Sequence, residues 1–545
     1  MSASVGVIAD ADAVLQSAAA VYHRDARALA VIDELRTRLH EPLRLAIAGM
    51  VKAGKSTLLN AMLGEQIAPT DTGECTRVVT WYRYSATPTV TMHPHKGAPR
   101  RMPIRREHGR LVLSLDGLTA DEVDWIDVGW PLEGLKSVIL IDTPGIGSLS
   151  GDTSARTERF LTPETSPSAA DAVVYLMRHV HGADVHFLEA FRDTAAGAAQ
   201  SVCAVSVLSR ADEIGSGRID SLLSAGKVAR RYENDGDLAS LVLRVIPVAG
   251  LLAEGARTLR ESEYIALREL AGLQRTDRER LLVSADRFVR PSETTTLSTD
   301  VREDLLTRFG IFGIRLATAL IRGGARSSSA LSEQMVQQSG LIELQEFVAA
   351  QFHTRAATLK ARGVLLRLQQ LLRDRPRDGL DEVHAGIERI EAGAHTLREL
   401  SLLAVARSNG LPISATDAED AQRIVGADGT AVHLRLGLPE DAAGDLVGAT
   451  VTKKIEHWRR TVQSPLTDRA AVGVCRVVLR SLDEIASEVG VGRSLRPAPD
   501  VMLAGGPGDG LGHHAAQQGE KHEGGLRGKK KRKRFAALPQ RHPLG

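Results

Sequence analysis

The stretch LAIAGMVKAGKSTLLNAML, residues 45–63, constrains the fold of this chain more than any other segment. It places two glycines, a lysine and a serine at the spacing G-x-x-x-x-G-K-[ST], after an apolar run of strand length and before a helix-forming segment. In that context the backbone N–H groups of the loop surround a phosphate, and the following helix N-terminus adds its dipole. The pattern therefore predicts a strand–loop–helix unit that binds a nucleotide. The alternative, a glycine-rich turn without a ligand, does not explain the flanking elements.

The residues of this loop have separate expected roles. Gly49 and Gly54 let the backbone turn tightly enough for its N–H groups to converge on a β-phosphate. Lys55 brings positive charge to the β- and γ-phosphate oxygens, and Ser56 offers a hydroxyl to Mg²⁺. The expected phosphate-contacting residues are Gly49, Val51, Lys52, Ala53, Gly54, Lys55, Ser56 and Thr57.

Strand-like and helical segments alternate from Leu43 to about Gly255. The β-branched runs are LRLAIAG, TRVVTWYRY, SVILIDTPG, ADAVVYLMR, SVCAVSVLS and LRVIPVAG. Helical segments such as KSTLLNAMLG and GADVHFLEAFRDTAAG separate most of them. This alternation predicts a doubly wound α/β domain with a mostly parallel sheet.

The segment ILIDTPGIG, residues 139–147, supplies the second part of a nucleotide-hydrolysing site. Asp142 ends an apolar run and can hold the Mg²⁺ shell through water, while Gly145 offers a backbone N–H to a γ-phosphate. A Pro-Gly turn without function is the alternative. Ile146 follows the glycine and has no polar atom with which to orient water, so catalysis must use another group.

Between these two segments, APTDTGECTRVVTW is the candidate switch. Thr76 is expected to close over Mg²⁺ and the γ-phosphate, so the predicted metal ligands are Ser56 and Thr76. Thr70 and Thr72 remain alternatives for that role, and Thr76 could instead only cap the following strand.

The loop that follows SVCAVSVL reads SRADE and is the candidate base-binding loop. A guanine-specific loop normally reads [NT]-K-x-D, and its carboxylate accepts two hydrogen bonds from the base. Asp212 keeps the carboxylate, Arg210 can stack on the ring as Lys does, and Ser209 is a shorter Thr. A surface Arg–Asp pair is the alternative. Guanine is the favoured base, with PVAG at 247–250 as a weak candidate for a further base contact.

Helical patterns dominate outside this domain. An apolar stripe at helical spacing predicts one long helix over residues 10–40, ended by Pro42. Further helical tracts are expected at 339–374, 378–408 and 465–489, with a Gly/Asp-rich break at 426–445. Aromatic residues are only 3% of the chain, which suits Leu- and Ala-rich helix packing. These segments predict an elongated helical bundle that the N-terminal helix completes.

The C-terminal segment differs in composition from the rest of the chain. Residues 495–545 are rich in Gly and Pro, end near KKKRKR at 529–534, and are expected to be disordered. From Arg496 onward there are ten basic and four acidic residues, so the rest of the chain carries a net charge of −4. No apolar run is long enough to span a membrane, and the N-terminus does not resemble a signal peptide. Three widely separated cysteines suggest neither disulfides nor zinc.

The segments GMVKAGKSTLLNAMLG, PTDTGECTRVVTWYRY, GWPLEGLKSVILIDTPGIGS and VLSRADEIGSG, with helices before and after, resemble bacterial dynamin-like GTPases. The similarity is greatest to the actinobacterial isoniazid-inducible branch and covers about residues 10–490. It implies a GTPase head at 43–320 on a helical stalk formed by 1–42 and 321–494, followed by the tail 495–545. Members of this family hydrolyse GTP to GDP with Mg²⁺, pair their heads across the nucleotide, and bind or remodel membranes.

The resemblance also assigns roles to single residues. Its nucleotide-contacting positions correspond to Gly49, Lys55, Ser56, Thr76, Asp142, Gly145 and Asp212. Lys52 stands where eukaryotic dynamins have a Ser that helps to hold a monovalent cation, so its ammonium is expected to replace that cation. The expected catalytic residues are Lys55, Thr76 and Lys52. No hydrophobic paddle is evident in the stalk, which argues against autonomous membrane insertion.

Three functions are compatible with the sequence. The favoured one is a GTP-hydrolysing mechanoenzyme that pairs with itself or with a paralogous dynamin-like protein. It would be cytoplasmic, at the inner face of the cell membrane, contacting anionic lipid through the stalk and the basic tail. The second is a slow, GTP-gated scaffold subunit. The third is an RNA or ribosome-assembly GTPase, which we do not favour because no aromatic residues accompany the basic run.

Overall fold

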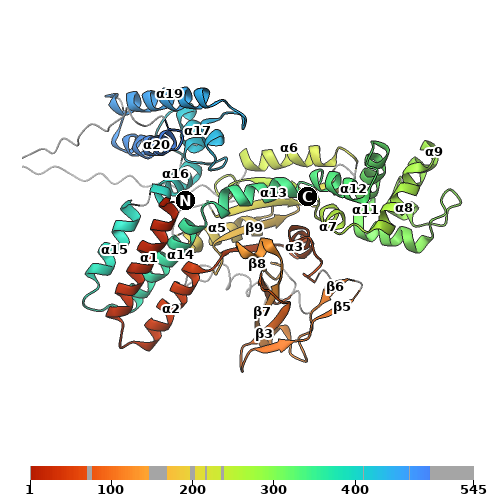
Figure 1. Ribbon diagram of the computed structural model, residues 1–545, viewed down its shortest axis with the longest axis horizontal. Helices are drawn as coiled ribbons and strands as arrows, with labels where there is room; N and C mark the ends of the chain where they lie inside the picture. Colours follow the sequence, from red (N-terminus) through yellow and green to blue (C-terminus); the bar gives the residue numbers. More distant parts are fainter. Residues whose placement is uncertain are drawn as a thin grey trace, which may run out of the picture. The chain divides into compact units, whose positions relative to one another are not determined.

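The computed structural model describes residues 2–69, 77–107, 109–146, 169–196, 203–214, 218–234, 238–393, 395–408, 410–465 and 467–490. Residues up to Arg493 form one compact unit. Its centre is a nine-stranded sheet with the order β11-β10-β9-β1-β8-β2-β7-β3-β4 (Figure 1). The remaining two strands, β5 (Arg105–Glu107) and β6 (Arg110–Val112), pair only with each other.

Five strands form the parallel half of the sheet. They are β1 (Leu43–Gly49), β8 (Val138–Asp142), β9 (Ala172–Met177), β10 (Ala204–Ser209) and β11 (Val245–Val248). Every residue of β9 and β10 is buried, as expected for strands covered by helices on both faces. Strand β1 lies within this half and pairs with β8 on one side and β9 on the other. The predicted doubly wound, mostly parallel fold is confirmed.

The other half of the sheet is mixed. Strand β2 (Val79–Tyr84) runs antiparallel to β8 and parallel to β7 (Val123–Trp130), and β3 (Thr89–Pro94) and β4 (Arg100–Met102) continue antiparallel to the edge. The strands between 89 and 130 were not predicted from the sequence. Strands β4, β5 and β6 have three residues each, and β3 buries only Val90 and Met92. Strand β7 has eight residues, but Asp124 and Asp127 interrupt its apolar residues, so the continuous apolar signal of the central strands is missing.

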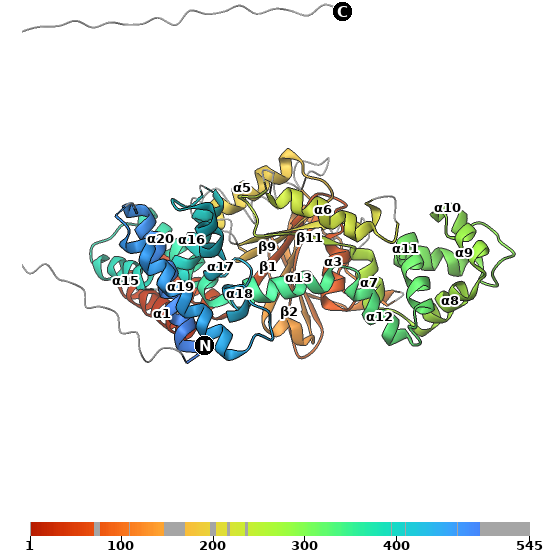
Figure 2. The same cartoon turned by 90° about the horizontal axis from the view of Figure 1, so that it is seen from above.

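Several helices flank the sheet. Helix α3 (Lys55–Leu63) packs on β1 and β8, whereas α6 (Ser221–Asn234) and α13 (Leu341–Val348) both pack against β11 (Figure 2). Helix α5 (Gly182–Ala196) follows β9. A further group of helices follows β11 in the sequence and extends the head. It consists of α7 (Gly250–Arg257), α8 (Glu261–Gly272), α9 (Arg275–Leu281), α10 (Ala285–Phe288), α11 (Thr299–Arg322) and α12 (Ser328–Gln337).

The N-terminal segment is a helical hairpin, so the prediction of one helix over 10–40 is wrong. Helix α1 (Ser2–Val21) ends before Asp25, whose carboxylate accepts hydrogen bonds from Arg27 and Ala28 N–H and so starts α2 (Ala26–His40). The apolar stripe continues through this break, because the two helices lie side by side and face the same partners.

Those partners are α14 (Ala356–Asp374) and α15 (Asp381–Gly393), which share a separate hydrophobic core with the hairpin. Figure 1 shows the four helices together. The Tyr22 hydroxyl donates a 2.5 Å hydrogen bond to the Arg375 carbonyl and thereby links the two interhelical turns. The apolar stripe of the N-terminal hairpin is therefore buried against helices that lie more than 300 residues later in the sequence.

The last helices form a second helical group. They are α16 (His395–Ser408), α17 (Ala415–Ile424), α18 (Val432–Leu436), α19 (Gly444–Gln463) and α20 (Arg469–Glu488). The predicted break at 426–445 is wrong in part, because α18 lies inside it. Helix α19 was not predicted, although Val451, Ile455 and Trp458 are buried at helical spacing. None of the helices in the described ranges is both long and apolar enough to cross a membrane. The predicted tail, 495–545, lies outside the described residues.

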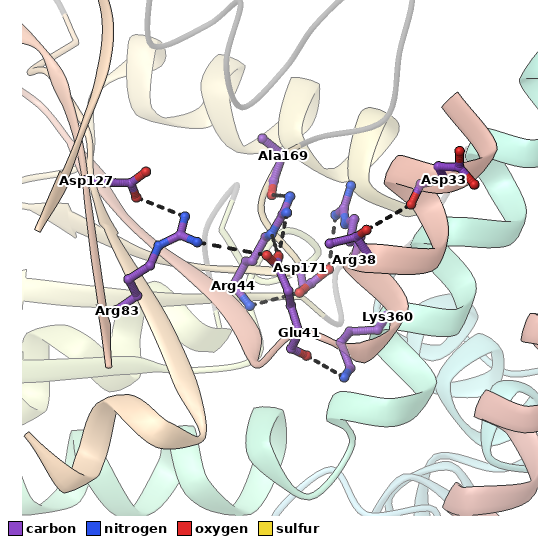
Figure 3. Close-up of polar contacts among 10 residues, drawn as sticks. Asp33, Arg38, Glu41, Arg44, Arg83, Asp127, Ala169, Asp171 and Lys360 are labelled. Carbon is purple, nitrogen blue, oxygen red and sulfur yellow. Dashed lines mark hydrogen bonds and ion pairs between the residues drawn. The ribbon is translucent and has the colours of Figure 1, made fainter. Parts of the chain in front are cut away.

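A network of charged residues joins the hairpin to the sheet (Figure 3). We call it the sheet–hairpin joint, and it consists of Arg38, Glu41, Arg44, Arg83, Asp127, Asp171 and Lys360. At its centre, Asp171 Oδ1 accepts from Arg38 at 3.0 Å and Asp171 Oδ2 accepts from the Arg44 backbone N–H at 2.9 Å. Arg38 and Asp171 are both buried.

Candidate nucleotide-binding site

Strand β1 ends and helix α3 begins on either side of the phosphate loop. Gly49 has φ +146°, and a Cβ at this position would lie 2.2 Å from the Leu176 carbonyl oxygen of the neighbouring strand. Gly54 precedes α3 with φ +93°, a conformation that favours glycine. The two glycines of the motif are therefore required by close approach and by backbone conformation.

Lys55 folds back over the loop. Its ammonium donates to the carbonyl oxygens of Gly49 at 3.1 Å and Met50 at 3.2 Å. Burial lowers the pKa of Lys55 to about 8, although the nearby Asp142 carboxylate opposes this shift. The ammonium thus lies at the centre of the loop, where its charge can reach phosphate oxygens.

Ser56 and Asp142 meet across the start of α3. The Ser56 hydroxyl donates to Asp142 Oδ2 at 2.8 Å, while Asp142 Oδ1 is buried and has no hydrogen-bond partner. Burial raises the pKa of Asp142 to about 6, against the effects of Lys55 and Ser56. A hydroxyl and a carboxylate with an unpaired buried oxygen fit the oxygen ligands and water shell that Mg²⁺ prefers. Thr76, the other predicted metal ligand, lies outside the described residues, as do Thr70 and Thr72.

The turn after β8 closes on the phosphate loop. Ile146 N–H donates to Gly49 O at 3.2 Å, and Val51 N–H donates to Ile146 O at 3.1 Å. A Cβ on Gly145 would lie 2.8 Å from Val51 Cα. Ile146 is buried and apolar, so it cannot orient water. Gly145 is therefore next to the loop, as its predicted role requires.

The SRAD loop follows β10. Arg210 has φ +52°, its guanidinium pairs with Glu213 at 2.8 Å, and it also donates to the Lys52 carbonyl oxygen at 3.4 Å. Asp212 is half-buried, and this burial raises the pKa of its carboxyl group. The Ser209 hydroxyl instead donates to the Met177 carbonyl oxygen at 3.0 Å, so it links the C-terminal ends of β10 and β9.

One cavity of about 170 Å³ connects the phosphate loop to the SRAD loop. The predicted residues that line it are Ala53, Gly54, Thr57, Ser209, Arg210 and Asp212. Gly250 of the PVAG segment also lines it, which supports the weak candidate for a further base contact. Leu176, Leu251 and Glu213 also line it and were not predicted. The fold brings Leu176 here, whereas Leu251 and Glu213 directly follow Gly250 and Asp212 in the sequence. Val51 and Lys52 are exposed, and Lys52 has φ +62°.

Comparison with known proteins gives the family. The model of the dynamin family matches residues 45–189. The isoniazid-induced protein IniC of Mycobacterium tuberculosis is 38% identical over 490 residues, which are 90% of this chain and 99% of that protein. A bacterial dynamin-like protein of Nostoc punctiforme is 32% identical over 148 residues, 25% of this chain and 20% of that protein.

A solved structure described as an oligomerised bacterial dynamin pair for the long-range sensing and tethering of membranes aligns with 90% of this chain and 76% of its own. Its TM-score is 0.35 and its identity is 12%, so it carries no further argument. The match along nearly the whole length of IniC is decisive. The chain belongs to the bacterial dynamin-like GTPases, in the branch of the isoniazid-induced protein IniC.

Proposed function

We propose that this GTPase binds GTP and Mg²⁺ in the cavity between the phosphate and SRAD loops and couples hydrolysis to head pairing and membrane binding. The observation that carries the nucleotide assignment is the cavity itself, which brings Gly54 and Thr57 together with Asp212. A carboxylate at this position can accept the N1–H and N2–H hydrogen bonds of guanine.

The roles of the other residues follow from their positions. Lys55 and the loop N–H groups would neutralise charge on the phosphates, and Ser56 and the shell around Asp142 would hold Mg²⁺. The family resemblance adds Thr76 to this set, and Thr76 lies outside the described residues. The metal ion, when bound, withdraws charge from the β- and γ-phosphate oxygens. Water attacks the γ-phosphorus and the bond to the β–γ bridging oxygen breaks, which yields GDP and phosphate.

Lys52 supplies the cationic charge that other dynamins take from a monovalent ion. Its side chain is exposed and its backbone has a left-handed conformation. Its carbonyl oxygen accepts a hydrogen bond from Arg210. We therefore expect turnover at equal rates in potassium chloride and in choline chloride at the same ionic strength. Turnover that requires potassium would contradict this role of Lys52.

The turn at Gly145 supplies the nucleotide-sensing contact. In the structure Ile146 is hydrogen-bonded to both Gly49 and Val51, so the turn occupies the edge of the phosphate loop. A γ-phosphate that accepts from Gly145 N–H would compete with these bonds and move the turn. This movement would bias head pairing and the angle of the helical stalk.

A membrane role is supported by the family and by the polybasic run at 529–534. We place the protein in the cytoplasm at the inner face of the cell membrane, in contact with anionic lipid through the stalk and tail. Its partner would be a second copy or a paralogous dynamin-like protein. An RNA or ribosome-assembly role has no comparable support.

A second function, a slow GTP-gated subunit, is favoured by Ile146, which stands where a catalytic glutamine would orient water. GTP turnover measured against protein concentration, with and without anionic liposomes, separates the two functions. The variant Lys55→Ala is the blank. Specific activity that rises with concentration or lipid supports assembly-stimulated catalysis, whereas slow, constant turnover with tight GTP binding supports the gated subunit.

A further inference from the structure

Basic residues gather on one edge of the head, in and beside the strands that the sequence did not predict. Between residues 96 and 110 there are six lysines and arginines and one acidic residue, Glu107. This concentration is unusual in a chain whose first 495 residues have a net charge of −4. We call the set the Arg-rich edge, and it consists of Lys96, Arg100, Arg101, Arg105, Arg106 and Arg110.

The fold exposes most of these cations. They lie in the β3–β4 turn, in the edge strand β4 and in the β5–β6 hairpin, and all but Arg110 are exposed. Arg106 pairs with Glu65 at 3.2 Å and lies over the Trp130 ring. Within the described part of the chain, Lys96, Arg100, Arg101 and Arg105 form no ion pair, so four positive charges remain uncompensated.

Protection of a sheet edge does not account for this surface. Charged side chains on an edge strand do prevent pairing with another sheet. However, Ile104 is 41% exposed in the middle of the cations, and an exposed apolar side chain works against such protection. The combination of basic side chains with one protruding apolar side chain is instead typical of segments that lie at a lipid headgroup boundary.

The aromatic residues distinguish lipid from nucleic acid. Binding of single-stranded nucleic acid uses exposed rings on which bases stack. Here Trp130 is 5% exposed beneath Arg106, and Trp125 is stacked on His93. Among its described residues, the edge therefore offers phosphate contacts and an apolar contact but no exposed Trp, Tyr or Phe ring for a base.

We propose that the Arg-rich edge is a membrane-binding surface of the head for anionic phospholipid headgroups, acting independently of the polybasic tail. This inference rests on the proposed membrane function and locates a second contact. Lys96, Arg100, Arg101 and Arg105 contact the phosphates, and Ile104 enters the boundary between headgroups and acyl chains. Each cation near an anionic bilayer strengthens binding about fivefold.

The test uses the full chain and vesicles of phosphatidylcholine with or without phosphatidylglycerol. In one protein, the six basic residues at 529–534 are replaced by Gln. A second protein adds Lys96→Gln, Arg100→Gln, Arg101→Gln and Arg105→Gln. The matched control adds the same loss of charge on the far side of the head, through Arg218→Gln, Lys227→Gln, Arg230→Gln and Arg231→Gln, all of which are exposed.

We expect the tail-neutral protein to sediment with anionic vesicles, and the edge substitutions to weaken this binding by at least about 100-fold. The control should lose less than about tenfold. The GTP turnover of the edge variant without vesicles should equal that of the wild type, which shows that it is folded.

Equal vesicle binding by the edge variant and the tail-neutral protein would overturn the inference and leave the membrane function standing. Absence of vesicle binding by the wild-type protein would overturn both. Loss of binding to a single-stranded RNA, without any change in vesicle binding, would assign the edge to nucleic acid and also overturn the inference.

Discussion

Lys55 and Asp142 are neighbouring charged groups whose surroundings disfavour both charges. Burial lowers the pKa of Lys55 to about 8 and raises the pKa of Asp142 to about 6. In the unfolded chain the pKa of Lys55 returns toward 10.5 and the pKa of Asp142 returns toward 3.8. The contribution of Asp142 to stability therefore falls as pH rises from about 4 to 6, and that of Lys55 recovers as pH rises from about 8 to 10.5. Between pH 6 and 8 both groups are charged and ready to bind phosphate and Mg²⁺.

We therefore predict that the affinity of the empty protein for Mg²⁺–GTP is greatest between pH 6 and 8. It should fall by up to about tenfold per pH unit on each side, because one proton must leave Asp142 or join Lys55 before binding. Fluorescent-nucleotide titration across pH measures this profile. When the titration is repeated with GDP and excess EDTA, the decline of nucleotide affinity below pH 6 should be smaller. An equal decline below pH 6 would contradict the role of Asp142.

Asp212 should decide the base. In Asp212→Asn the amide no longer accepts both hydrogen bonds of guanine but can donate to the C2 carbonyl of xanthine. Two charge-assisted hydrogen bonds at about 1.5–3 kcal/mol each predict a loss of GTP affinity of at least about 100-fold. Competition between GTP and XTP measures the change. Asp220→Asn, at an exposed position nearby, is the matched control and should bind GTP normally.

The sheet–hairpin joint connects two elements that the sequence analysis treated separately. Asp171 begins the segment that leads into β9, and its carboxylate holds both the backbone N–H of Arg44 in β1 and the guanidinium of Arg38 in α2. Lys360 of α14 donates to the Glu41 carbonyl oxygen at 2.7 Å, so the second pair of helices is attached at the same place. The strand that carries the phosphate loop is therefore connected to the helical hairpin through Asp171 (Figure 3).

We predict that Asp171→Ala lowers the free energy of unfolding by about 3–5 kcal/mol, because it leaves the buried Arg38 without its partner. Denaturant titration measures the loss. Arg36→Met is the comparison, since the Arg36–Asp12 pair is partly exposed and should be worth less than about 1 kcal/mol. Similar losses in both variants would mean that burial does not distinguish the two pairs.

The whole helical hairpin is tied to the rest of the molecule by its own core. Leu15, Tyr22, Ile32 and Leu39 are buried against apolar residues of α14 and α15. Without the hairpin, that face of α14 and α15 would be exposed to water and would favour aggregation.

Removal of residues 1–42 should therefore give a protein that aggregates or melts well below the full chain, even though the phosphate loop is intact. Removal of residues 495–545, which the sequence predicts to be disordered, should leave the melting temperature unchanged. Size-exclusion chromatography and thermal melting test both deletions. A monomeric 43–545 protein that melts as the full chain does would show that the hairpin core is dispensable.

The fold and the family could be predicted from the sequence because the signal for them is local. The phosphate loop, the DTPG turn and the SRAD loop each lie within a few consecutive residues, and the central strands are continuous apolar runs. Prediction failed where the signal is weak or spread along the chain. Strands β4, β5 and β6 have three residues each and contain arginines, and β3 buries only alternate residues. The apolar stripe of α1 and α2 continues across Asp25 as though there were one helix.

The sequence alone determined the fold of the nucleotide-binding half, because a phosphate loop works through the backbone of adjacent residues and needs glycine at fixed positions. Only the tertiary structure decided how that half is joined to the helices. Arg38 and Asp171 are 133 residues apart, and neither has a local partner that would reveal the pair. Tertiary packing also places the arginines between residues 96 and 110 on one exposed edge of the head. The short strands that carry them pair with neighbours that no local sequence pattern specifies.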